Sequence, residues 1–333
     1  MEVNKTGTIS VVTGGSGFVG SHLVDLLISK GHEVRCIVRK TSSLKWLEGK
    51  NVKIFDCGIS DVEALEDVLA GADYLFHVAG VVKAKNEEGY KKGNVETTRN
   101  LLDALLKFKV DIKKVVIVSS LTAAGPAVPG KPLTEDMPVN PITRYGKSKA
   151  EQEALVKTYL DKLPISIVRP PAVYGERDTE IYLMFKTFKQ GLMTFIGFDK
   201  KELSLVHVAD LVNGIYLAGI SENSKSQTYF ISSEEIYNWY QVADEMQNSI
   251  GKKAIRLNLP HFLVYSVAVF AEFFAMFQKS AATFNIEKAR DFVQSAWTCD
   301  VSKAKKELGY EQKVSLADGI KRTVDWYKDN NWL

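Results

Sequence analysis

A tyrosine, a lysine and a serine are the residues of this sequence best suited to acid–base chemistry. Tyr145 and Lys149 lie in RYGKSKAE, and positions i and i+4 share one face of a helix. An ammonium group beside a phenol stabilises the phenolate, so we expect the pKa of Tyr145 to be lowered from about 10 toward neutral pH. Ser120 ends the apolar run VVIVSS, where its hydroxyl can hold a substrate oxygen. The three residues predict proton transfer at an oxygen atom.

A glycine-rich turn near the start of the chain has the spacing of a dinucleotide site. TGGSGFVG places Gly14, Gly17 and Gly20 after an apolar run and at the start of a helical pattern. Glycines there allow a tight turn, a close approach of backbone to pyrophosphate, and close helix packing. The helix N-terminus then presents free N–H groups to the phosphates. No GK[ST] follows, which excludes a P-loop.

The residue that follows the second strand should choose between NAD and NADP. An acidic residue there would hydrogen-bond the ribose diol, but the sequence reads CIVRKTSS. Arg39, with Lys40 and Ser42 nearby, suits a 2′-phosphate, because a guanidinium pairs with phosphate through two hydrogen bonds. We therefore expect NADP, with NAD as the alternative. A solvated basic loop is the other interpretation of these residues.

Alternating strands and helices must position these groups. Helical patterns over residues 17–29, 62–69, 90–108 and 144–160 separate apolar runs at 8–14, 32–39, 51–57, 73–80, 113–120 and 165–170. Strands that are apolar on both faces indicate a parallel sheet covered on both sides. The prediction is an α/β fold, a doubly wound parallel Rossmann sheet, whose carboxyl edge collects the three catalytic candidates and the glycine turn.

The regular alternation of strands and helices ends after residue 170. This change predicts a smaller, discontinuous C-terminal substrate domain. We assign 1–170 and about 204–232 to the nucleotide domain, and 171–203 and 233–333 to the substrate domain. Phe185, Phe188, Phe195 and Phe198 are expected to line an apolar cavity. The apolar segment 262–277 contains Glu272 and is shorter than the roughly 20 residues of a membrane span. We expect it to be a buried or interfacial helix, with a peripheral membrane contact as one possibility.

Composition and charge exclude several classes of protein. An apolar fraction of 45% and a charged fraction of 25% are ordinary globular values, and the net charge of +3 gives no global field for nucleic acid. The 3 cysteines form no CxxC pair, so we expect neither a disulfide framework nor a metal site. No signal peptide fits the polar first residues, and we expect a cytoplasmic protein. His77 and His207 are expected to make structural hydrogen bonds, and Arg177 with Asp178 a surface pair.

Taken together, the motifs resemble the extended short-chain dehydrogenase/reductase family over nearly the whole chain. They are TGGSGFVG, FHVAG, NVETTRNLLDA with Asn94, VSSLTAAG, YGKSK, RPPAVYG and VHVADL. The resemblance implies that Tyr145 is the general acid/base and that Lys149 is its partner and a nicotinamide-ribose ligand. It makes Ser120 the donor to the substrate oxygen, with Thr122 as a helper.

The same resemblance implies the remaining cofactor contacts. Gly14, Gly17, Phe18 and Val19 would hold the pyrophosphate, Ala79 would line the nicotinamide side, and residues from Pro170 to Val173 would lie near the carboxamide. The family's Gly-Asp after the third strand is replaced by Cys57-Gly58, so backbone around Gly58 and Ile59 would line the adenine pocket instead. A homodimer through the helices at 90–108 and 144–160 is expected, as in relatives.

Three departures from the family's sugar enzymes set the expected substrate. Leu121-Thr122 replaces the acid pair of the dehydratases, and Ala172 and Leu203 replace the Asn and Arg near the diphosphate in epimerases. The chain then looks like dihydroflavonol 4-reductases and 3β-hydroxysteroid dehydrogenases. We expect NAD(P)-dependent interconversion of a secondary alcohol and a ketone on a small, apolar or cyclic substrate. The alternative is a nucleotide-sugar epimerase with a transient keto intermediate. The intact catalytic set argues against a cofactor-binding regulator without turnover.

Overall fold

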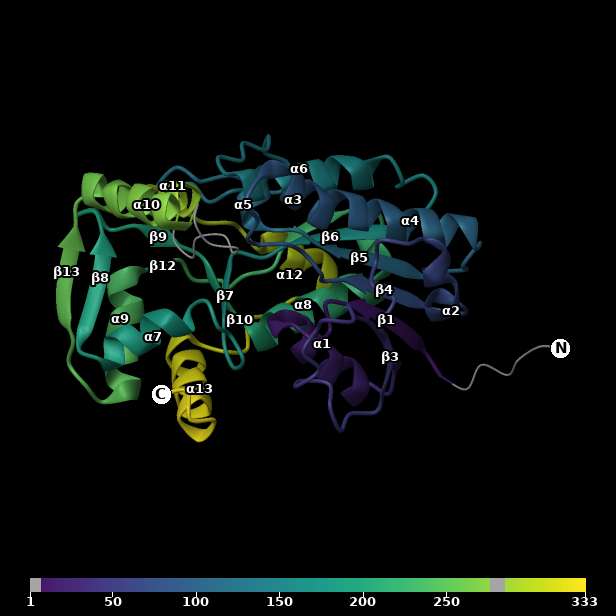
Figure 1. Cartoon of the computed structure of the whole chain (residues 1–333), viewed down its shortest axis with the longest axis horizontal. Coiled ribbons are helices and arrows are strands. Elements are labelled where there is room, and N and C mark those ends of the chain that lie inside the picture. Colours follow the sequence, from purple (N-terminus) through teal and green to yellow (C-terminus); the bar gives the residue numbers. More distant parts are fainter. Residues whose placement is uncertain (1–6, 276–284) are drawn as a thin grey trace.

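A seven-stranded parallel sheet forms the centre of the nucleotide-binding half of the chain. In the computed structural model, which describes residues 7–275 and 285–333, the strand order is β11-β6-β5-β4-β1-β2-β3. All neighbouring strands pair in parallel (Figure 1). The strands are β1 (Ile9–Thr13), β2 (Glu33–Ile37), β3 (Val52–Phe55), β4 (Tyr74–His77), β5 (Lys114–Val118), β6 (Ile165–Arg169) and β11 (Thr228–Phe230). The predicted doubly wound Rossmann sheet is confirmed.

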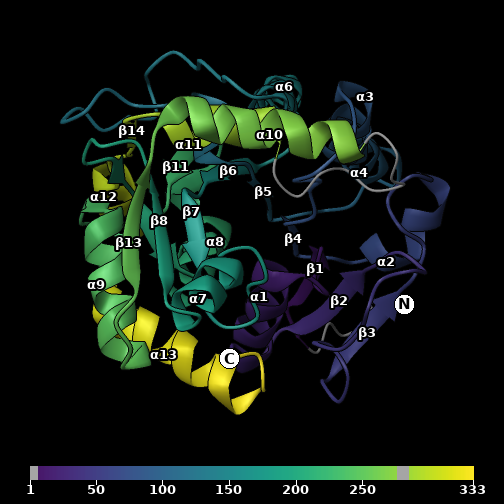
Figure 2. The same ribbon diagram turned by 60° about the vertical axis from the view of Figure 1, so that its left-hand side comes forward.

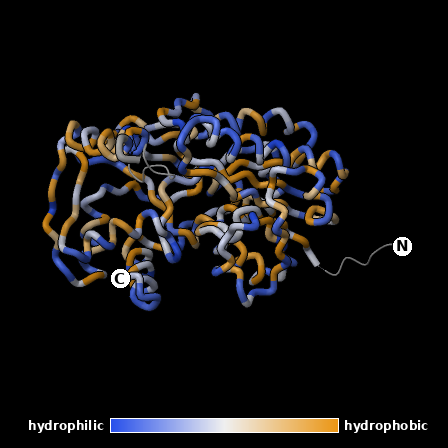
Figure 3. Tube along the Cα trace, in the orientation of Figure 1, coloured by the Kyte–Doolittle hydropathy of each residue, from blue (hydrophilic) through white to orange (hydrophobic). Residues whose placement is uncertain are grey.

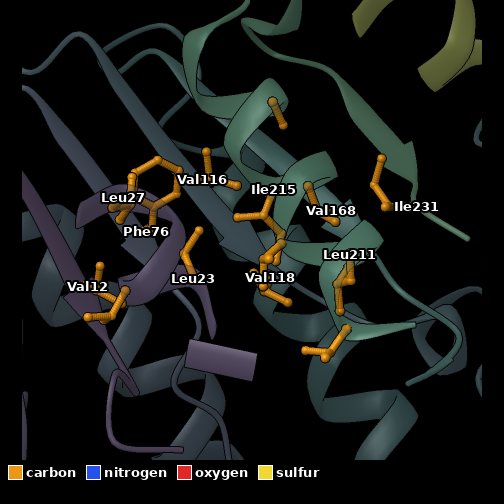
Figure 4. Close-up of a cluster of buried hydrophobic side chains, with 14 of the residues drawn as sticks. Val12, Leu23, Leu27, Phe76, Val116, Val118, Val168, Leu211, Ile215 and Ile231 are labelled. Atoms are coloured by element: carbon orange, nitrogen blue, oxygen red, sulfur yellow. The ribbon is translucent and has the colours of Figure 1, made fainter. Parts of the chain in front are cut away.

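Helices cover both faces of this sheet, because its strands are apolar on both sides. One face packs on α1 (Phe18–Ser29), α8 (Val208–Ile220) and α12 (Ser302–Leu308), and Figure 4 shows Leu23, Phe76, Val116 and Ile215 meeting there. The other face packs on α2 (Glu66–Leu69), α4 (Thr97–Lys107) and α6 (Arg144–Lys157). Figure 3 shows the hydrophobic colouring concentrated along the central strands.

The strand order changes direction beside β1, and this determines where a ligand can bind. β1 leads to β2 and β3 on one side, whereas β4, β5 and β6 follow on the other. In open α/β sheets, ligands bind at the carboxyl ends of the strands at such a switch point. The ends of β1 and β4, which carry Gly14 and Ala79, therefore form the floor of the candidate site.

The second half of the chain forms three small sheets and several helices. The sheets are β7 (Ala172–Tyr174) with β10 (Leu205–His207), β9 (Glu202–Leu203) between β12 (Tyr237–Asn238) and β14 (Ala296–Trp297), and β8 (Leu192–Ile196) with β13 (Ile255–Leu259). The helices are α7 (Tyr182–Lys189), α9 (Trp239–Ile250), α10 (His261–Ala275), α11 (Ile286–Val293) and α13 (Leu316–Asp329). Phe185, Phe188, Met246 and Tyr327 form their buried core.

The chain returns to the nucleotide half after β14. Ala304, Leu308 and Tyr310 pack in the same cluster as Tyr229 and the inner face of α1. The segment 233–333, predicted as one part of the substrate domain, thus contributes to both cores. Sequence periodicity cannot show this return, because an amphipathic helix such as α12 does not identify the surface that it covers.

Helix α10 corresponds to the described part of the predicted segment 262–277, whose last two residues lie outside the described residues. Figure 2 shows α10 running across the top of the molecule toward α3 (Glu87–Tyr90). Val264 and Ala268 are buried against Ala289 of α11, whereas Phe262 and Phe270 are 72% and 64% exposed. Within the described residues, no helix has the length and apolarity needed to cross a membrane.

Candidate active site

The glycine turn brings the ends of β1 and β4 into close contact. Gly14 has φ +72°, and an added Cβ would lie 2.8 Å from the backbone nitrogen of Ala79. A Cβ on Gly20 would overlap the carbonyl oxygen of Gly14. Only glycine fits these positions, so the turn can bring its backbone against a bulky group such as pyrophosphate.

The N-terminus of α1 is open to an anion. Gly17 is its N-cap and offers no side-chain hydrogen bond, and the first turn has no acidic residue. The first N–H groups of a helix are without intrahelical partners and attract negative charge. Phe18 and Val19 begin this helix and are partly buried against the sheet core. This arrangement fits the predicted pyrophosphate site of an NAD(P) cofactor.

The predicted adenosine side lies at the ends of β2 and β3. Arg39 is exposed and forms an isolated bridge with Cys57, and its backbone N–H donates to Ser42 Oγ at 3.1 Å. Among the described residues, the Arg39 guanidinium has no carboxylate partner. Gly58 follows with φ +68°, and its N–H donates to the Val38 carbonyl at 3.0 Å. The Ile59 carbonyl accepts from Asn100 Nδ2 at 2.9 Å, which fixes the loop beside Arg39.

Ser120, Tyr145 and Lys149 come together at the carboxyl end of β5. Thr122 donates to Ser120 Oγ twice, from its backbone nitrogen at 3.2 Å and from Oγ1 at 2.9 Å. These two bonds use the acceptor capacity of the serine hydroxyl, so its own proton is directed outward. The Ser120 hydroxyl lies near enough to the Tyr145 phenol to lower the pKa of that phenol. The sequence-predicted pair and its helper Thr122 thus lie in one cluster.

Gly146 allows this cluster to form. A Cβ on Gly146 would overlap the Thr122 carbonyl oxygen, so α6 lies directly against the short helix α5 (Leu121–Ala124) that carries Thr122. Thr143 caps α6 by accepting from the Gly146 N–H at 3.2 Å. Tyr145 is therefore placed by a close helix contact on one side and a capped helix start on the other. Sequence analysis gave Gly146 no role.

The pKa values in the cluster differ from the expectation. Burial raises the pKa of Tyr145 to about 12, and the hydrogen bond with Ser120 acts in the opposite direction. Burial also lowers the pKa of Lys149 to about 8. Lys149 Nζ donates to the Val118 carbonyl at 2.8 Å rather than to the phenol. The predicted lowering of the Tyr145 pKa is therefore wrong, because burial outweighs the effect of the neighbouring Ser120 and keeps the phenol protonated near neutral pH.

A π-helical turn (Lys91–Glu96) supports the loop after β4. Asn94 accepts from the Val81 N–H at 2.7 Å and donates to the Val81 carbonyl at 3.1 Å and to Ser148 Oγ at 2.9 Å. These bonds tie α6 to the loop that contains Ala79 and Gly80. A π-turn is rare and often occurs at functional sites. The sequence predicted one helix over 90–108 and could not place this bulge.

A buried ion pair anchors the other end of the catalytic helix. Arg169 donates to Glu153 from Nε at 2.9 Å and from Nη2 at 2.6 Å, and Ser119 Oγ donates to the same carboxylate at 2.5 Å. The pair joins α6 to the end of β6, beside Pro170. The Pro170 carbonyl accepts from the Leu121 N–H at 2.8 Å. Val173 directly follows the exposed Ala172 and is partly buried against the nucleotide-side core.

The two predicted structural histidines are buried in polar networks. His77 contacts Thr13 Oγ1 at 2.7 Å and Thr98 Oγ1 at 3.0 Å, so it links β4 with β1 and α4. His207 lies 3.3 Å from Glu176. In the described part of the chain, no cluster of three metal-ligating side chains is found.

Arg177 and Asp178 do not form the predicted surface pair. Arg177 donates to Asp25 at 2.8 Å and to Ser21 at 3.0 Å. Asp178 is buried and caps the following turn, because it accepts from the N–H groups of Glu180 and Ile181. The side chains of Arg177 and Asp178 therefore point to different sides of this loop. The backbone of Arg177 has a positive φ of 71°.

The phenylalanines expected to line a substrate cavity mostly form core instead. Phe185 and Phe188 are buried in the substrate-side core, and Phe195 stacks on Tyr240 with ring centroids 4.4 Å apart. Phe198 is 74% exposed. Leu203, at the position of the epimerase arginine, is buried in the same core. The prediction that Phe185, Phe188 and Phe195 line a cavity is therefore wrong. Their side chains fill the space between β8, α7 and α9.

Comparison with known proteins gives the family. The model of the NAD dependent epimerase/dehydratase family matches residues 10–232. Ceramide reductase of Caulobacter vibrioides is 26% identical, over 100% of this chain and 98% of that protein. Sterol-4-alpha-carboxylate 3-dehydrogenase, decarboxylating, of Homo sapiens is 24% identical over 95% and 87%. UDP-glucuronate 4-epimerase of Thermodesulfobacterium geofontis is 26% identical over 96% of each.

Solved structures show the same fold. The crystal structure of gox2253 has a TM-score of 0.81 and 29% identity, and the match covers 97% of this chain and 98% of that one. UDP-glucose 4-epimerase of Thermotoga maritima has a TM-score of 0.80 and 23% identity, over 97% and 100%. The match to the family model and the full-length relatives agree with the glycine turn and the Ser120, Tyr145 and Lys149 cluster. The chain belongs to the NAD dependent epimerase/dehydratase family and is an enzyme of the extended short-chain dehydrogenase/reductase type.

Proposed function

We propose that the protein is an NADP-dependent oxidoreductase that interconverts a secondary alcohol and a ketone on a small, apolar or cyclic substrate. The observation that carries the proposal is the cluster in which Thr122 orients Ser120, and Ser120 in turn acts on the phenol of Tyr145. Such a cluster can bind one substrate oxygen and exchange one proton with it. When bound, the nicotinamide supplies or accepts the hydride.

The residues of the chain would divide the proton chemistry among them. In the reductive direction, Ser120 and Tyr145 hydrogen-bond the ketone oxygen, and Tyr145 donates its proton as charge develops there. The ammonium of Lys149 lies near Gly80, where an added Cβ would be 3.7 Å from Nζ. In the proposed mechanism its charge stabilises the phenolate that the proton transfer leaves behind. The raised pKa of Tyr145 keeps the phenol protonated near neutral pH, which is the protonation state that a proton donor needs.

We infer an apolar substrate because the chain lacks the acidic and phosphate-binding side chains of the family's sugar enzymes. Leu121-Thr122 offers no carboxylate for the elimination of water, and Leu203 is an apolar residue buried in the core, with no charge to offer a diphosphate. A nucleotide sugar brings phosphate charges that its site must neutralise. Two full-length relatives also favour an apolar substrate, since one is a ceramide reductase and another a sterol dehydrogenase.

NADP is the proposed cofactor because of Arg39. Its guanidinium is exposed beside Ser42 and has no carboxylate partner among the described residues. Relatives of known structure bind NAD, so NAD is the alternative that a titration must exclude.

Nucleotide-sugar epimerisation remains the second candidate. It is favoured by one observation, the full-length similarity to UDP-glucuronate 4-epimerase. An epimerase removes and returns the same hydride, so its cofactor undergoes no net change. A screen of steroid, dihydroflavonol, ketoceramide and nucleotide-sugar substrates with NADPH and NADH, followed at the nicotinamide absorbance, separates the two. Net oxidation with an apolar ketone supports the reductase, whereas conversion of a nucleotide sugar without net oxidation supports the epimerase.

We also propose a cytoplasmic homodimer that touches a membrane through the exposed face of α10. That face consists of Phe262, Leu263, Val267 and Phe270, and apolar side chains on an amphipathic helix can enter the lipid interface. Sedimentation with vesicles of phosphatidylcholine tests the membrane contact, with Phe262→Ser/Phe270→Ser as the variant. Equal sedimentation of the variant and the unchanged protein would contradict the membrane contact.

Light scattering tests the dimer separately. A mass equal to one chain would contradict the proposed homodimer.

A further inference from the structure

A buried histidine lies between the floor of the candidate site and the catalytic helix, and the mechanism above gives it no role. His77 ends β4, and it has no exposed surface. Its Nδ1 atom lies 2.7 Å from Thr13 Oγ1 at the end of β1, and its Nε2 atom lies 3.0 Å from Thr98 Oγ1 on α4. Both threonines are fully buried as well. We call these three hydrogen-bonded residues, Thr13, His77 and Thr98, the His77 network.

The other partners of the two threonines fix the direction of each hydrogen bond in the His77 network. Thr98 Oγ1 donates its only proton to the Asn94 carbonyl at 2.7 Å, so it must accept from His77 Nε2. Burial lowers the pKa of His77 to about 3, so the ring is neutral near neutral pH and carries its one proton on Nε2. Thr13 then donates to Nδ1 and accepts from the Ala79 N–H at 3.1 Å.

The two ends of the His77 network reach the two parts of the candidate site that must be aligned. At one end, Thr13 directly precedes Gly14 of the glycine turn. At the other end, Thr98 accepts from Gln152 Nε2 at 2.7 Å, and Gln152 lies on α6 shortly after Lys149. Transfer of a hydride and a proton to one substrate requires the cofactor and the acid/base group to be held in a fixed geometry. The His77 network therefore spans the distance on which the reaction depends.

We propose that His77 is a positioning residue that sets the distance between the floor of the cofactor site and the catalytic helix α6. The inference rests on the proposed function only in that a nicotinamide and Tyr145 act on the same substrate, which is equally required of a reductase and of an epimerase. Breaking the network leaves both parts of the site folded and able to bind, but no longer aligned. Turnover should then fall much more than the affinity for the cofactor.

Substitutions at Thr98 test the inference, with NADPH and cyclohexanone as the probes. Thr98→Val retains the shape of the side chain and removes its hydroxyl. Because a displacement of about 1 Å can cost on the order of 100-fold in rate, we expect kcat to fall by about tenfold or more. The KM for the ketone and the affinity for NADP⁺, measured by fluorescence titration, should change little. Thr98→Ser retains the hydroxyl and should recover most of the lost kcat.

Thr323→Val is the matched control for the loss of a buried hydroxyl. Thr323 lies on α13, is also fully buried, and donates to the Gly319 carbonyl at 2.7 Å, as Thr98 does to Asn94. Thr323→Val should therefore lower the melting temperature to a similar degree and leave kcat unchanged. An unchanged kcat in Thr98→Val, or an equal loss in both variants, would overturn the inference. If UDP-glucose is epimerised and cyclohexanone is not reduced, the proposed function is wrong, and the same comparison on UDP-glucose decides the inference.

The tautomer of His77 provides a readout that does not depend on turnover. Nuclear magnetic resonance of the full chain, with the heavy nitrogen isotope in its histidine rings, reports which ring nitrogen carries the proton; the signals lost in His77→Asn identify this residue. We expect a neutral His77 ring protonated on Nε2, whose signals shift when NADP⁺ or NAD⁺ binds. His32, which lies 2.7 Å from Ser10 Oγ near the amino end of β1, should not respond. A proton on Nδ1, or no response of His77 to either cofactor, overturns the inference, and this result alone decides it if neither probe is converted.

Discussion

In the proposed mechanism, proton transfer depends on the direction of the Ser120 hydroxyl. Thr122 occupies the acceptor side of Ser120 with two hydrogen bonds, at 3.2 and 2.9 Å. The serine proton is left to Tyr145 or to a substrate oxygen. Tyr145 holds its own proton firmly, because burial raises its pKa to about 12. A bound cofactor and substrate must therefore change the surroundings of Tyr145 before it can serve as a base in the oxidative direction.

Removing the phenolic oxygen of Tyr145 should stop turnover without disturbing the fold. Tyr145→Phe keeps the ring and loses the proton donor, so kcat should fall by roughly 10²- to 10⁴-fold. Cofactor affinity, measured by fluorescence titration, should change little. Lys149→Met should impair both quantities, because Lys149 is expected to contact the ribose. Near-normal turnover in Tyr145→Phe would remove Tyr145 from the mechanism.

Arg39 should determine the choice of cofactor. Arg39→Asp removes the proposed phosphate contact and introduces a carboxylate that can accept from the ribose diol. Losing a charge-assisted hydrogen bond costs about 1.5–3 kcal/mol, so the ratio of NADPH to NADH affinity should fall at least tenfold. Lys45→Asp, at an exposed position farther along the chain, is the matched control and should leave that ratio unchanged. Tighter binding of NADH than NADPH by the unchanged protein would contradict the assignment.

At the scale of elements, close contacts between helices set the geometry of the site. The contact of α5 with α6 depends on Gly146, and the contact of α6 with the loop after β4 depends on Asn94. The Glu153–Arg169 pair holds the same helix to β6. Three independent attachments therefore fix the helix that carries Tyr145 and Lys149.

Gly146→Ala should separate α5 from α6 and displace Tyr145 from Ser120. The added methyl group would overlap the Thr122 carbonyl oxygen, and a displacement of about 1 Å at a catalytic group can cost on the order of 100-fold in rate. We expect kcat to fall by that order while circular dichroism shows a folded chain. Lys147→Ala, on the exposed side of α6, should leave kcat unchanged. Full activity in Gly146→Ala would show that the close contact is dispensable.

The order of elements could be predicted from the sequence, whereas the contacts between distant elements could not. Apolar runs and helical spacing located the six predicted strands of the parallel sheet and the helices between them, because periodicity reports which face is buried. The π-turn at Asn94 has no periodic signature. The Glu153–Arg169 pair joins residues of different elements. Its formation depends on tertiary packing, which one sequence does not reveal.

At the scale of the whole molecule, two sets of ion pairs join the halves of the chain. Glu176 lies between His207 and Arg322, at 3.3 and 3.0 Å, and its backbone carbonyl contacts His22 of α1 at 2.9 Å. Glu180 pairs with Lys83 from the loop after β4 and with Lys288 of α11. Both glutamates lie in the loop between β7 and α7, so the chain crosses between the halves at the edge of the candidate site.

Global stability should decrease in mild acid because of His77. Burial, assisted by the charge of Lys149, lowers the pKa of His77 to about 3. Below pH 6.5 the unfolded chain binds a proton at this position and the folded chain does not, so stability falls as the pH decreases toward 3, by about 1.4 kcal/mol per pH unit.

Urea unfolding between pH 4 and pH 7 measures this slope. His77→Asn should remove the proton that the unfolded chain binds at this position, so the free energy of unfolding should depend less on pH. His261→Asn, at an exposed position, should leave that pH dependence unchanged. Identical slopes for His77→Asn and the unchanged protein would mean that His77 does not govern acid stability.

The destination of the hydride tests the central claim most directly. The protein is incubated with NADPH that carries deuterium at C4 of the nicotinamide, together with an apolar ketone from the steroid, dihydroflavonol or ketoceramide classes, and the product is examined by mass spectrometry. The account predicts an alcohol with deuterium on the carbinol carbon, formed in equal amount to oxidised cofactor and lost in Tyr145→Phe. Conversion of a nucleotide sugar to its epimer, with no net cofactor oxidation and no ketone reduced, would contradict it.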